Sequence, residues 1–517
     1  DDYTDTDANG DGIWDNPYPI DGDNDSYPLM ERFENYNEMS ESPWPMFQHD
    51  AQHTGRSPFV GPGIIENPEI NMLIGGSDTD YFYTPVIGSE GSLYFRGRIN
   101  GKEGIYAFAP DGTEKWYYPS LLHITGPPTV ARDGCIYFYV HRERYKNVSL
   151  ILINSDGTLK WEKTLLNAYP VGYPVIDNNG KIYFLASSSA GDSGKLIALN
   201  PNSGNSLWTY ELQGNIVRQT PAIDQNGAIY FGQGDTLFVI NPNGTEKWRR
   251  SFPSILLNGS QVFNRTTIET PSIADDGTIY AIVRGEKEWE TLTAHGWSNG
   301  LHAIDPENPY QERWFKYIRS VGSPPTIDAN GNVYIAGGCD PAGTWYTDLY
   351  GFDPQGNYLE NWPLLLGYVG RAELLVVDKE GIIYGLFGQN TVKAFGRNGT
   401  QRWSLSGFDS STGKPLSLGK DGTLYVPGWQ WLYAVEPTPE ELLDVPFFSQ
   451  RNPAWSDKKL DHSPYSIGEY GCALTSAAMV AKYFGYDTDP DMLNTSLTEV
   501  GGLDTSGDLH WAKVEEV

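Results

Sequence analysis

The first residues of the chain carry carboxylates at alternate positions, a pattern that suits calcium. Asp7, Asn9, Asp11 and Asp15 fall at positions 1, 3, 5 and 9 of a calcium-binding loop, with a glycine at position 6. Tyr18 stands where a bidentate Glu usually closes such a loop. The full set of candidate Ca²⁺ ligands is Asp5, Asp7, Asn9, Asp11, Asp15, Asp21, Asp23 and Asp25. The last three can close the first loop or form a second site.

Like charges this close repel one another, so the acidic segment needs a cation to become ordered. The alternative interpretation is a solvated acidic linker. The spacing resembles the calcium-binding Asp repeats of thrombospondin type 3 and dockerin-like segments in secreted proteins. That resemblance implies that residues 1–30 bind Ca²⁺ and that the protein is extracellular or lies at the cell surface.

Cys472 is the second candidate for chemistry, because a helix is expected to begin at this residue. The stretch from Cys472 to Phe484 has helical composition and periodicity, and Gly485 ends it. The helix dipole and the free N–H groups at a helix N-terminus favour a thiolate, which is the nucleophilic form of cysteine. Gln450, about twenty residues upstream, can donate from its amide to an oxyanion. The alternative is a cysteine buried in a helix.

Three motifs near the end of the chain resemble those of papain-fold cysteine peptidases of the bacteriocin-processing type. They are Val445-Pro-Phe-Phe-Ser-Gln450, Tyr470-Gly-Cys472 and Asp489-Pro-Asp-Met-Leu-Asn494. The resemblance implies a peptidase-like domain over 445–517, preceded by a linker at 438–444. It also implies that Cys472 is the nucleophile and that Gln450 is the oxyanion donor.

This peptidase-like domain is incomplete in the chain as written. In the family, the catalytic His and its Asp or Asn partner lie well downstream of the cysteine. His510 is the only histidine after Cys472, and its segment precedes a helix in the family rather than carrying the base. Without a base the thiol has no partner to take its proton, so a competent peptidase is not expected. Either a precursor continues past Val517, or the domain has become a binding or anchoring module.

A repeated phrase predicts the elements that hold these sites. An acidic residue or Asn, then Gly, any residue, an apolar residue and Tyr recur eight times, with 41 to 54 residues between successive tyrosines. The tyrosines are Tyr94, Tyr137, Tyr183, Tyr230, Tyr280, Tyr334, Tyr384 and Tyr425. The Gly-containing phrase is a hairpin turn, a Pro-Asp-Gly-Thr type segment makes a second turn, and a Trp opens a fourth strand. Eight units of four antiparallel strands predict a mainly β protein with an eight-bladed β-propeller over 43–437.

The eighth unit lacks the strand that a Trp would open. The segment from Trp44 to Ile74 precedes the first unit and can supply that strand, which would close the ring without an exposed edge. The same segment begins with Trp44-Pro-Met-Phe-Gln-His-Asp-Ala-Gln-His-Thr-Gly-Arg56. That phrase and the docking motif between Ala198 and Trp208 resemble those of pyrroloquinoline-quinone-type propellers.

The quinone-type resemblance implies the fold, with the tryptophans as inter-blade packing and His49, His53 and Arg56 in structural roles. Its dehydrogenases hold the quinone with adjacent cysteines or with a clustered Ca²⁺ site, whereas other relatives are cofactor-free scaffolds. Cys135, Cys339 and Cys472 are the cysteines of the chain, and none is adjacent to another. A non-catalytic scaffold is therefore expected.

The composition further limits the kinds of partner that the protein can bind. The chain has 66 acidic and 36 basic residues, a net charge of −30, so binding of nucleic acid through its phosphates is excluded. No apolar run is long enough for a transmembrane helix. The main hypothesis is a secreted or cell-surface, Ca²⁺-binding multidomain protein whose propeller binds a protein or glycan ligand. The alternatives are a purely structural part of an extracellular assembly and, less favoured, a quinone-dependent dehydrogenase.

Overall fold

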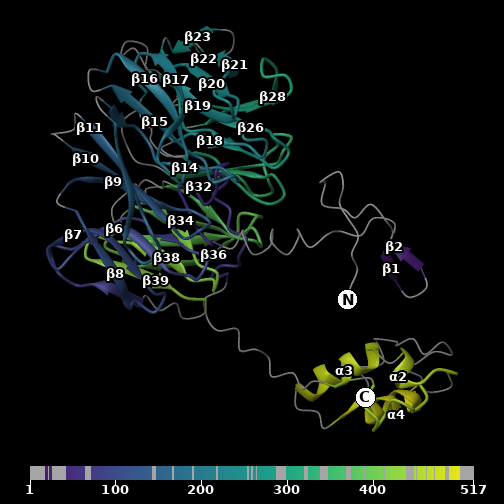
Figure 1. Ribbon diagram of the computed structural model, residues 1–517. Helices are drawn as coiled ribbons and strands as arrows, with labels where there is room; N and C mark the ends of the chain where they lie inside the picture. Colours follow the sequence, from purple (N-terminus) through teal and green to yellow (C-terminus); the bar gives the residue numbers. More distant parts are fainter. Residues whose placement is uncertain are drawn as a thin grey trace. The chain divides into compact units, whose positions relative to one another are not determined.

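The repeated phrases fold into β-sheets of a propeller, as the sequence predicts (Figure 1). The computed structural model describes residues 18–20, 23–25, 42–63, 71–120, 122–142, 147–165, 168–188, 191–216, 219–252, 255–257, 260–263, 265–286, 299–318, 324–337, 347–367, 374–388, 390–410, 414–437, 448–449, 451–460, 463–470, 472–483 and 488–500. Residues Asp1–Pro437 and Thr438–Val517 form two separate compact units.

The first four blades follow one another in chain order. Blade 1 comprises β4 (Tyr81–Phe82), β5 (Val86–Ile87), β6 (Leu93–Ile99), β7 (Lys102–Phe108) and β8 (Glu114–Pro119). Blade 2 comprises β9 (Ile124–Val130), β10 (Ile136–Arg142), β11 (Asn147–Ile153) and β12 (Leu159–Leu165). Blade 3 comprises β13 (Ala168–Pro170), β14 (Val175–Ile176), β15 (Ile182–Ser188), β16 (Ser193–Leu199) and β17 (Ser206–Gln213). Blade 4 comprises β18 (Ala222–Ile223), β19 (Ile229–Gln233), β20 (Thr236–Ile240) and β21 (Glu246–Ser251).

The last four blades continue the pattern after a hairpin of β22 (Ile255–Leu257) and β23 (Ser260–Phe263). Blade 5 comprises β24 (Arg265–Ile268), β25 (Ser272–Ile273), β26 (Ile279–Glu286), β27 (Asn299–Ile304) and β28 (Glu312–Ile318). Blade 6 comprises β29 (Thr326–Ile327), β30 (Val333–Gly337), β31 (Thr347–Phe352) and β32 (Leu364–Gly367). Blade 7 comprises β33 (Val376–Val377), β34 (Ile383–Phe387), β35 (Thr391–Phe395) and β36 (Gln401–Ser406). Blade 8 comprises β37 (Ser417–Leu418), β38 (Leu424–Pro427), β39 (Trp431–Val435) and β3 (Asn71–Gly75).

Strand β3 closes the ring, which confirms the sequence prediction. It lies outermost in blade 8 and pairs antiparallel with β39, with Asn71 opposite Ala434 and Gly75 opposite Trp431. Figure 1 shows β38 and β39 beside β6, β7 and β8, so the two ends of the propeller sequence meet. A strand from the start of the chain in the last blade removes an open edge from the ring.

An aspartate two residues before the repeated phrase, together with the tyrosine of the phrase, stabilises the inner hairpin of blades 3, 4, 6 and 7. In blade 4, the Asp224 carboxylate accepts the backbone N–H groups of Asn226 (2.9 Å) and Ala228 (2.8 Å) and the hydroxyl of Tyr230 (2.9 Å). Gly227 has a φ of 79°, which favours glycine at that position of the turn. The repeated phrase is therefore a turn with its own cap rather than a ligand site.

The tryptophans dock each blade on the next one, as expected. Trp116 donates from Nε1 to the Ser155 carbonyl (2.7 Å), and a Cβ at Gly157 would lie 2.8 Å from its ring. The indoles of Trp161, Trp208, Trp314 and Trp362 bond in the same way to carbonyls of the following blade. Trp248 is an exception, because its buried Nε1 has no hydrogen-bond partner among the described residues.

The second unit contains three described helices, α2 (Ile467–Tyr470), α3 (Cys472–Tyr483) and α4 (Pro490–Val500). Helix α3 matches the helix predicted from Cys472. Its Leu474 and Ala478 pack with Leu493 and Leu497 of α4 in a small core. No helix among the described residues is long and apolar enough to cross a membrane.

Candidate functional site

Residues 42–63, here called the axial segment, run along the innermost strands of the propeller. Their carbonyls accept the backbone N–H at one repeated position, the end of the innermost strand, in blades 1, 2, 4, 5, 6 and 7. The bonds are Ile87 to Trp44 (2.8 Å), Val130 to Pro45 (2.8 Å), Ile223 to Ala51 (2.7 Å), Ile273 to Gln52 (2.9 Å), Ile327 to Thr54 (2.7 Å) and Val377 to Gly55 (3.0 Å). This one segment thus ties six blades together.

A tight turn within the axial segment is held by Asp50. Its carboxylate accepts the backbone N–H of Thr54 at 2.9 Å and the Thr54 hydroxyl, and lies 3.4 Å from Nδ1 of His49. Burial alone would raise the pKa of Asp50, but the bonds from His49 and Thr54 outweigh it and the pKa is lowered. His49 and His53 have φ values of 72° and 58°, a left-handed conformation that non-glycine residues adopt only under tertiary constraint.

His53 of this turn is a structural side chain. Its Nδ1 lies 3.2 Å from the Pro271 carbonyl, which only accepts, so Nδ1 carries the proton. Complete burial lowers the pKa of His53 to about 4, so the ring is neutral near pH 7. The structural role expected for this histidine fits that geometry.

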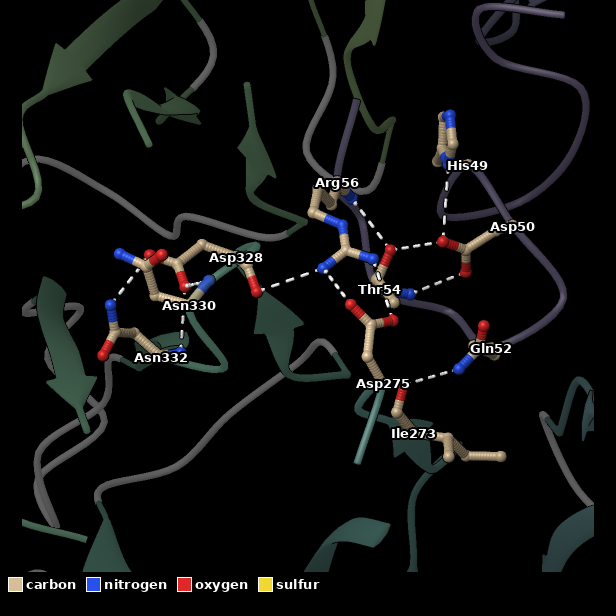
Figure 2. A network of polar contacts seen from close by, with 10 residues as sticks. All are labelled: His49, Asp50, Gln52, Thr54, Arg56, Ile273, Asp275, Asp328, Asn330 and Asn332. Atoms are coloured by element: carbon tan, nitrogen blue, oxygen red, sulfur yellow. Dashed lines mark hydrogen bonds and ion pairs between the residues drawn. The ribbon is translucent and has the colours of Figure 1, made fainter. Parts of the chain in front are cut away.

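Arg56 of the axial segment joins blades 5 and 6, and its partner Asp328 extends the network to blade 7 (Figure 2). Its guanidinium binds both carboxylate oxygens of Asp275 at 2.9 and 3.0 Å, and Nη1 donates to the Asp328 carbonyl at 3.2 Å. Asp275 follows β25 in blade 5, and Asp328 follows β29 in blade 6. The carboxylate of Asp328 also accepts Nε of Arg397 from blade 7 at 3.1 Å. The charged groups around Arg56 therefore serve to join neighbouring blades.

A second cluster, missed by the sequence reasoning, lies between blades 8 and 1. We call it the blade 8–1 seam and define it by Tyr81, Tyr83, Arg96, Lys414 and Trp429. The Lys414 ammonium lies 4.8 Å from the ring centre of Trp429 and 5.7 Å from that of Tyr83. The Arg96 guanidinium lies 4.5 Å from the ring of Tyr83 and 5.9 Å from that of Tyr81.

The seam lies at the opposite end of the innermost strands from the axial segment. In blade 1, Tyr81 pairs with Arg98 at one end of β6, whereas Ile87, which binds the axial segment, pairs with Leu93 at the other end. Trp429 lies in the hairpin between β38 and β39, and Lys414 precedes β37. These residues come from both ends of the propeller sequence, so no local spacing brings them together.

The predicted calcium ligands mostly lie outside the described residues. The exceptions are Asp23 and Asp25, whose backbone forms β2 (Asp23–Asp25), paired antiparallel with β1 (Tyr18–Ile20). The ligands Asp5, Asp7, Asn9, Asp11, Asp15 and Asp21 are not among the described residues. The Ca²⁺ site therefore stays a prediction.

The predicted peptidase residues are placed only in part. Cys472 is the first residue of α3, as expected, while Gln450 and His510 lie outside the described residues. The carboxylate of Asp489 caps α4 by accepting the backbone N–H of Met492 at 2.8 Å. The chemistry of Cys472 stays a prediction.

Cys135 of blade 2 is buried, and its thiol lies 3.4 Å from the Lys160 ammonium. Burial, together with the neighbouring Asp133, raises the pKa of Cys135. The thiol form is therefore favoured. Cys339 lies outside the described residues.

Comparison with known proteins supports the repeat type. Residues 82–308 match the family model described as outer membrane protein assembly factor BamB, a model of PQQ-like repeats. The chain is similar in fold to the quinohemoprotein alcohol dehydrogenase from Comamonas testosteroni, with 11% identity, coverage of 95% of this chain and 98% of that chain, and a TM-score of 0.55. The quinohemoprotein alcohol dehydrogenase ADHIIG from Pseudomonas putida HK5 has 12% identity, coverage of 88% and 87%, and a TM-score of 0.52. At these identities the likeness shows the fold alone. No curated protein matches the sequence.

The described residues do not fit a metal-assisted quinone centre. They contain no group of three His, Cys, Asp or Glu side chains placed to hold a metal ion. The chain also has no adjacent cysteines. In addition, Asp50, Arg56 and Asp328 of the axial network are already bonded to protein groups.

Proposed function

We propose that this eight-bladed propeller of PQQ-like repeats is a non-catalytic binding scaffold in a secreted or cell-surface, Ca²⁺-binding multidomain protein. The observation that carries the proposal is the axial segment. Its carbonyls tie six blades together, and its charged groups pair with protein partners rather than converging on an open centre. A rigid ring of this kind presents the loops at its mouth in fixed positions for a protein or glycan ligand.

The acidic N-terminal segment has a supporting role in this proposal. Oxygen ligands from residues 5–25 would hold Ca²⁺, and the bound ion would neutralise the repulsion that otherwise keeps the segment extended. A cation requirement of this kind suits a secreted or cell-surface setting, where calcium is abundant.

The C-terminal unit is proposed to be the first part of a papain-like domain. Cys472 at the start of α3 would be its nucleophile, and Gln450 would stabilise the oxyanion. Their activity would need a His and an Asp or Asn partner from further sequence. If these are absent from the natural protein, the unit serves as a binding or anchoring module.

Dye-linked alcohol oxidation tests the non-catalytic assignment. The full chain is incubated with pyrroloquinoline quinone, Ca²⁺ and a panel of alcohols, and dye reduction and quinone absorbance are recorded. We expect no turnover and no bound chromophore. Turnover that depends on the quinone would overturn the scaffold proposal in favour of a dehydrogenase.

Thiol labelling tests the peptidase-like unit. The rate of Cys472 alkylation is measured against pH in the intact chain by peptide mapping, with Cys135 as the internal buried control. An activated thiolate reacts well below the pH at which an ordinary thiol does. A rate as slow as that of Cys135 would favour the purely structural alternative for this unit.

A further inference from the structure

We infer that the blade 8–1 seam binds a glycan that carries carboxylate groups, such as one containing uronic acids. The inference rests on the proposed scaffold function and adds a site and a ligand class to it. Its basis is an exposed aromatic surface beside two cations that the protein itself neutralises only in part.

The aromatic surface is formed by Trp429 and the two tyrosines of blade 1. Trp429 is 54% exposed, although it is a large apolar side chain that is ordinarily buried. Tyr81 and Tyr83 are half-buried and meet edge to face at 6.1 Å. Flat rings of this kind offer rigid apolar area, with little loss of side-chain entropy, to the C–H faces of a sugar ring.

The position of Trp429 is fixed by the protein before any ligand binds. Asp409 accepts the backbone N–H groups of Trp429 (3.2 Å) and Gln430 (2.7 Å) and the hydroxyl of Tyr433 (2.8 Å). The Gln430 side chain also donates to Asp78 at 3.0 Å. Asp409 is thus occupied in holding the hairpin, and the exposed indole is preorganised.

Lys414 is a cation without a carboxylate partner in the described part of the chain. Its ammonium donates to the Gly428 carbonyl at 2.9 Å, and among the described residues it forms no ion pair with a carboxylate within 4.0 Å. Burial lowers the pKa of Lys414 to about 8, with partial compensation from Asp409. A protein with a net charge of −30 has many acidic groups to offer, so a partly buried ammonium left unpaired marks a place for an external anion.

Arg96 adds a second incompletely satisfied cation. It is only 5% exposed and forms one ion pair, with Glu103 at 3.3 Å, while its Nε is buried without a partner. Because its Nε is not accessible, Arg96 contributes positive charge beside Tyr83 rather than a free donor. The charges of Arg96 and Lys414, both close to the Tyr83 ring, favour a ligand that carries several carboxylates.

A sugar fits the seam better than a peptide strand. A peptide that adds to a sheet needs a strand with an open edge. The edge strand of blade 1 at the seam is β4, which pairs with β6 and is two residues long, too short to hold an added strand. The seam therefore offers rings and cations rather than an edge of free backbone groups. A carboxylate-bearing glycan can stack its sugar rings on the aromatic side chains and pair its carboxylates with the cations.

The experiment is calorimetric titration of the full chain with a galacturonic acid oligomer. The matched ligand control is the same oligomer after methyl esterification, which keeps the sugar and removes the charge. Chelator is present throughout, so that Ca²⁺ bridging through the acidic segment does not contribute. Binding of the free acid, with at least a tenfold weaker affinity for the ester, is the expected result.

Two variants locate the site. Trp429→Ala and Lys414→Met are each expected to lower the affinity at least tenfold. Their controls are Tyr310→Ala, which removes an aromatic residue that is 71% exposed in blade 5, and Lys379→Met, which removes an exposed lysine near the axial segment. The controls are expected to leave the affinity within twofold. Circular dichroism melting of each variant confirms that the ring is folded.

Three outcomes would overturn the inference. They are equal affinity of all four variants, equal binding of acid and ester, and equal or tighter binding of a polyglutamate peptide. None of these outcomes would be evidence for quinone-dependent turnover. The scaffold proposal would therefore remain, and only the proposed site or ligand class would be wrong. Quinone-dependent oxidation with intact glycan binding would instead overturn the scaffold proposal alone.

Discussion

The two ends of the innermost strands differ in how they treat charged side chains. At the end that holds the axial segment, the Asp328 carboxylate accepts five hydrogen bonds, from the backbone of Asn330 and from groups of Asn332, Tyr334 and Arg397. At the blade 8–1 seam, the Lys414 ammonium makes one hydrogen bond within the described part of the chain, to the Gly428 carbonyl. Charged groups whose hydrogen bonds are all made within the protein stabilise the fold, whereas incompletely bonded ones favour ligand binding. The contrast therefore assigns a structural role to the axial end and a recognition role to the blade 8–1 seam.

Asp328→Ala is expected to give the largest effect. The substitution leaves the buried Tyr334 hydroxyl and the buried Asn332 amide without their acceptor and also unpairs the partly exposed Arg397, so we expect a loss of about 3–5 kcal/mol in the free energy of unfolding. Urea denaturation followed by tryptophan fluorescence measures it. Glycan affinity at the opposite end should not change if the ring refolds. A loss under about 1 kcal/mol would contradict the view that this end is structural.

Arg56→Ala should have a smaller effect than Asp328→Ala. Its partner Asp275 has a side chain that is 51% exposed, which limits the worth of that ion pair to about 1 kcal/mol or less. The guanidinium also holds the Asp328 carbonyl, so we expect Arg56→Ala to cost about 1–2 kcal/mol in total. Asp275→Ala is the matched control, since it removes only the ion pair. Equal losses from both variants in the same denaturation assay would show that the contact with blade 6 adds nothing.

Most of the fold was predictable because its signals are local and repeated. The Gly and Tyr of each unit mark a hairpin, which in blades 3, 4, 6 and 7 is capped by an aspartate just before the repeated phrase, as Asp224 does with Tyr230, and the Trp docks on the next turn. The closing strand β3 was predictable because the last repeat lacks a fourth strand, which a segment from elsewhere in the chain has to supply. Trp362 of blade 6 is a small departure: it precedes β32 and is followed by Pro363, while blades 1 to 5 and 7 place the Trp within the outer strand.

The candidate sites were less predictable, for a physical reason. The axial histidines and Arg56 stood out as a motif, but their partners, such as Asp275, lie over two hundred residues away. The seam joins Tyr83 to Lys414 and Trp429, which no spacing rule connects. Local turn chemistry is readable from sequence, whereas contacts across the ring closure depend on how the last blade meets the first.

Lys414→Met gives the smallest expected change in stability. Its sign is opposite to that of Asp328→Ala and Arg56→Ala, because this substitution is expected to stabilise the protein. The pKa of Lys414 in the folded protein is lowered to about 8 from an ordinary value near 10.5, so the unfolded chain binds more protons between those pH values. Stability contributed by this group therefore rises with pH through that window, and below pH 8 the folded protein bears the full cost of a partly buried charge. The methionine keeps the apolar stem without the charge, so the variant should be more stable than the parent at pH 7, by about 1 kcal/mol or less.

The comparison with the parent protein across pH is what tests this last expectation. Asp409 and Tyr83 face the same ammonium and remain in both proteins, and so do Arg96 and the raised pKa values of the buried tyrosines, so their contributions largely cancel in the difference. The advantage of Lys414→Met should shrink as pH rises from about 8 to 10.5, measured by urea denaturation at each pH. A constant difference, or a variant less stable at pH 7, would mean that the ammonium is already compensated within the protein. The seam would then resemble the axial end, and the contrast between structure and recognition would be lost.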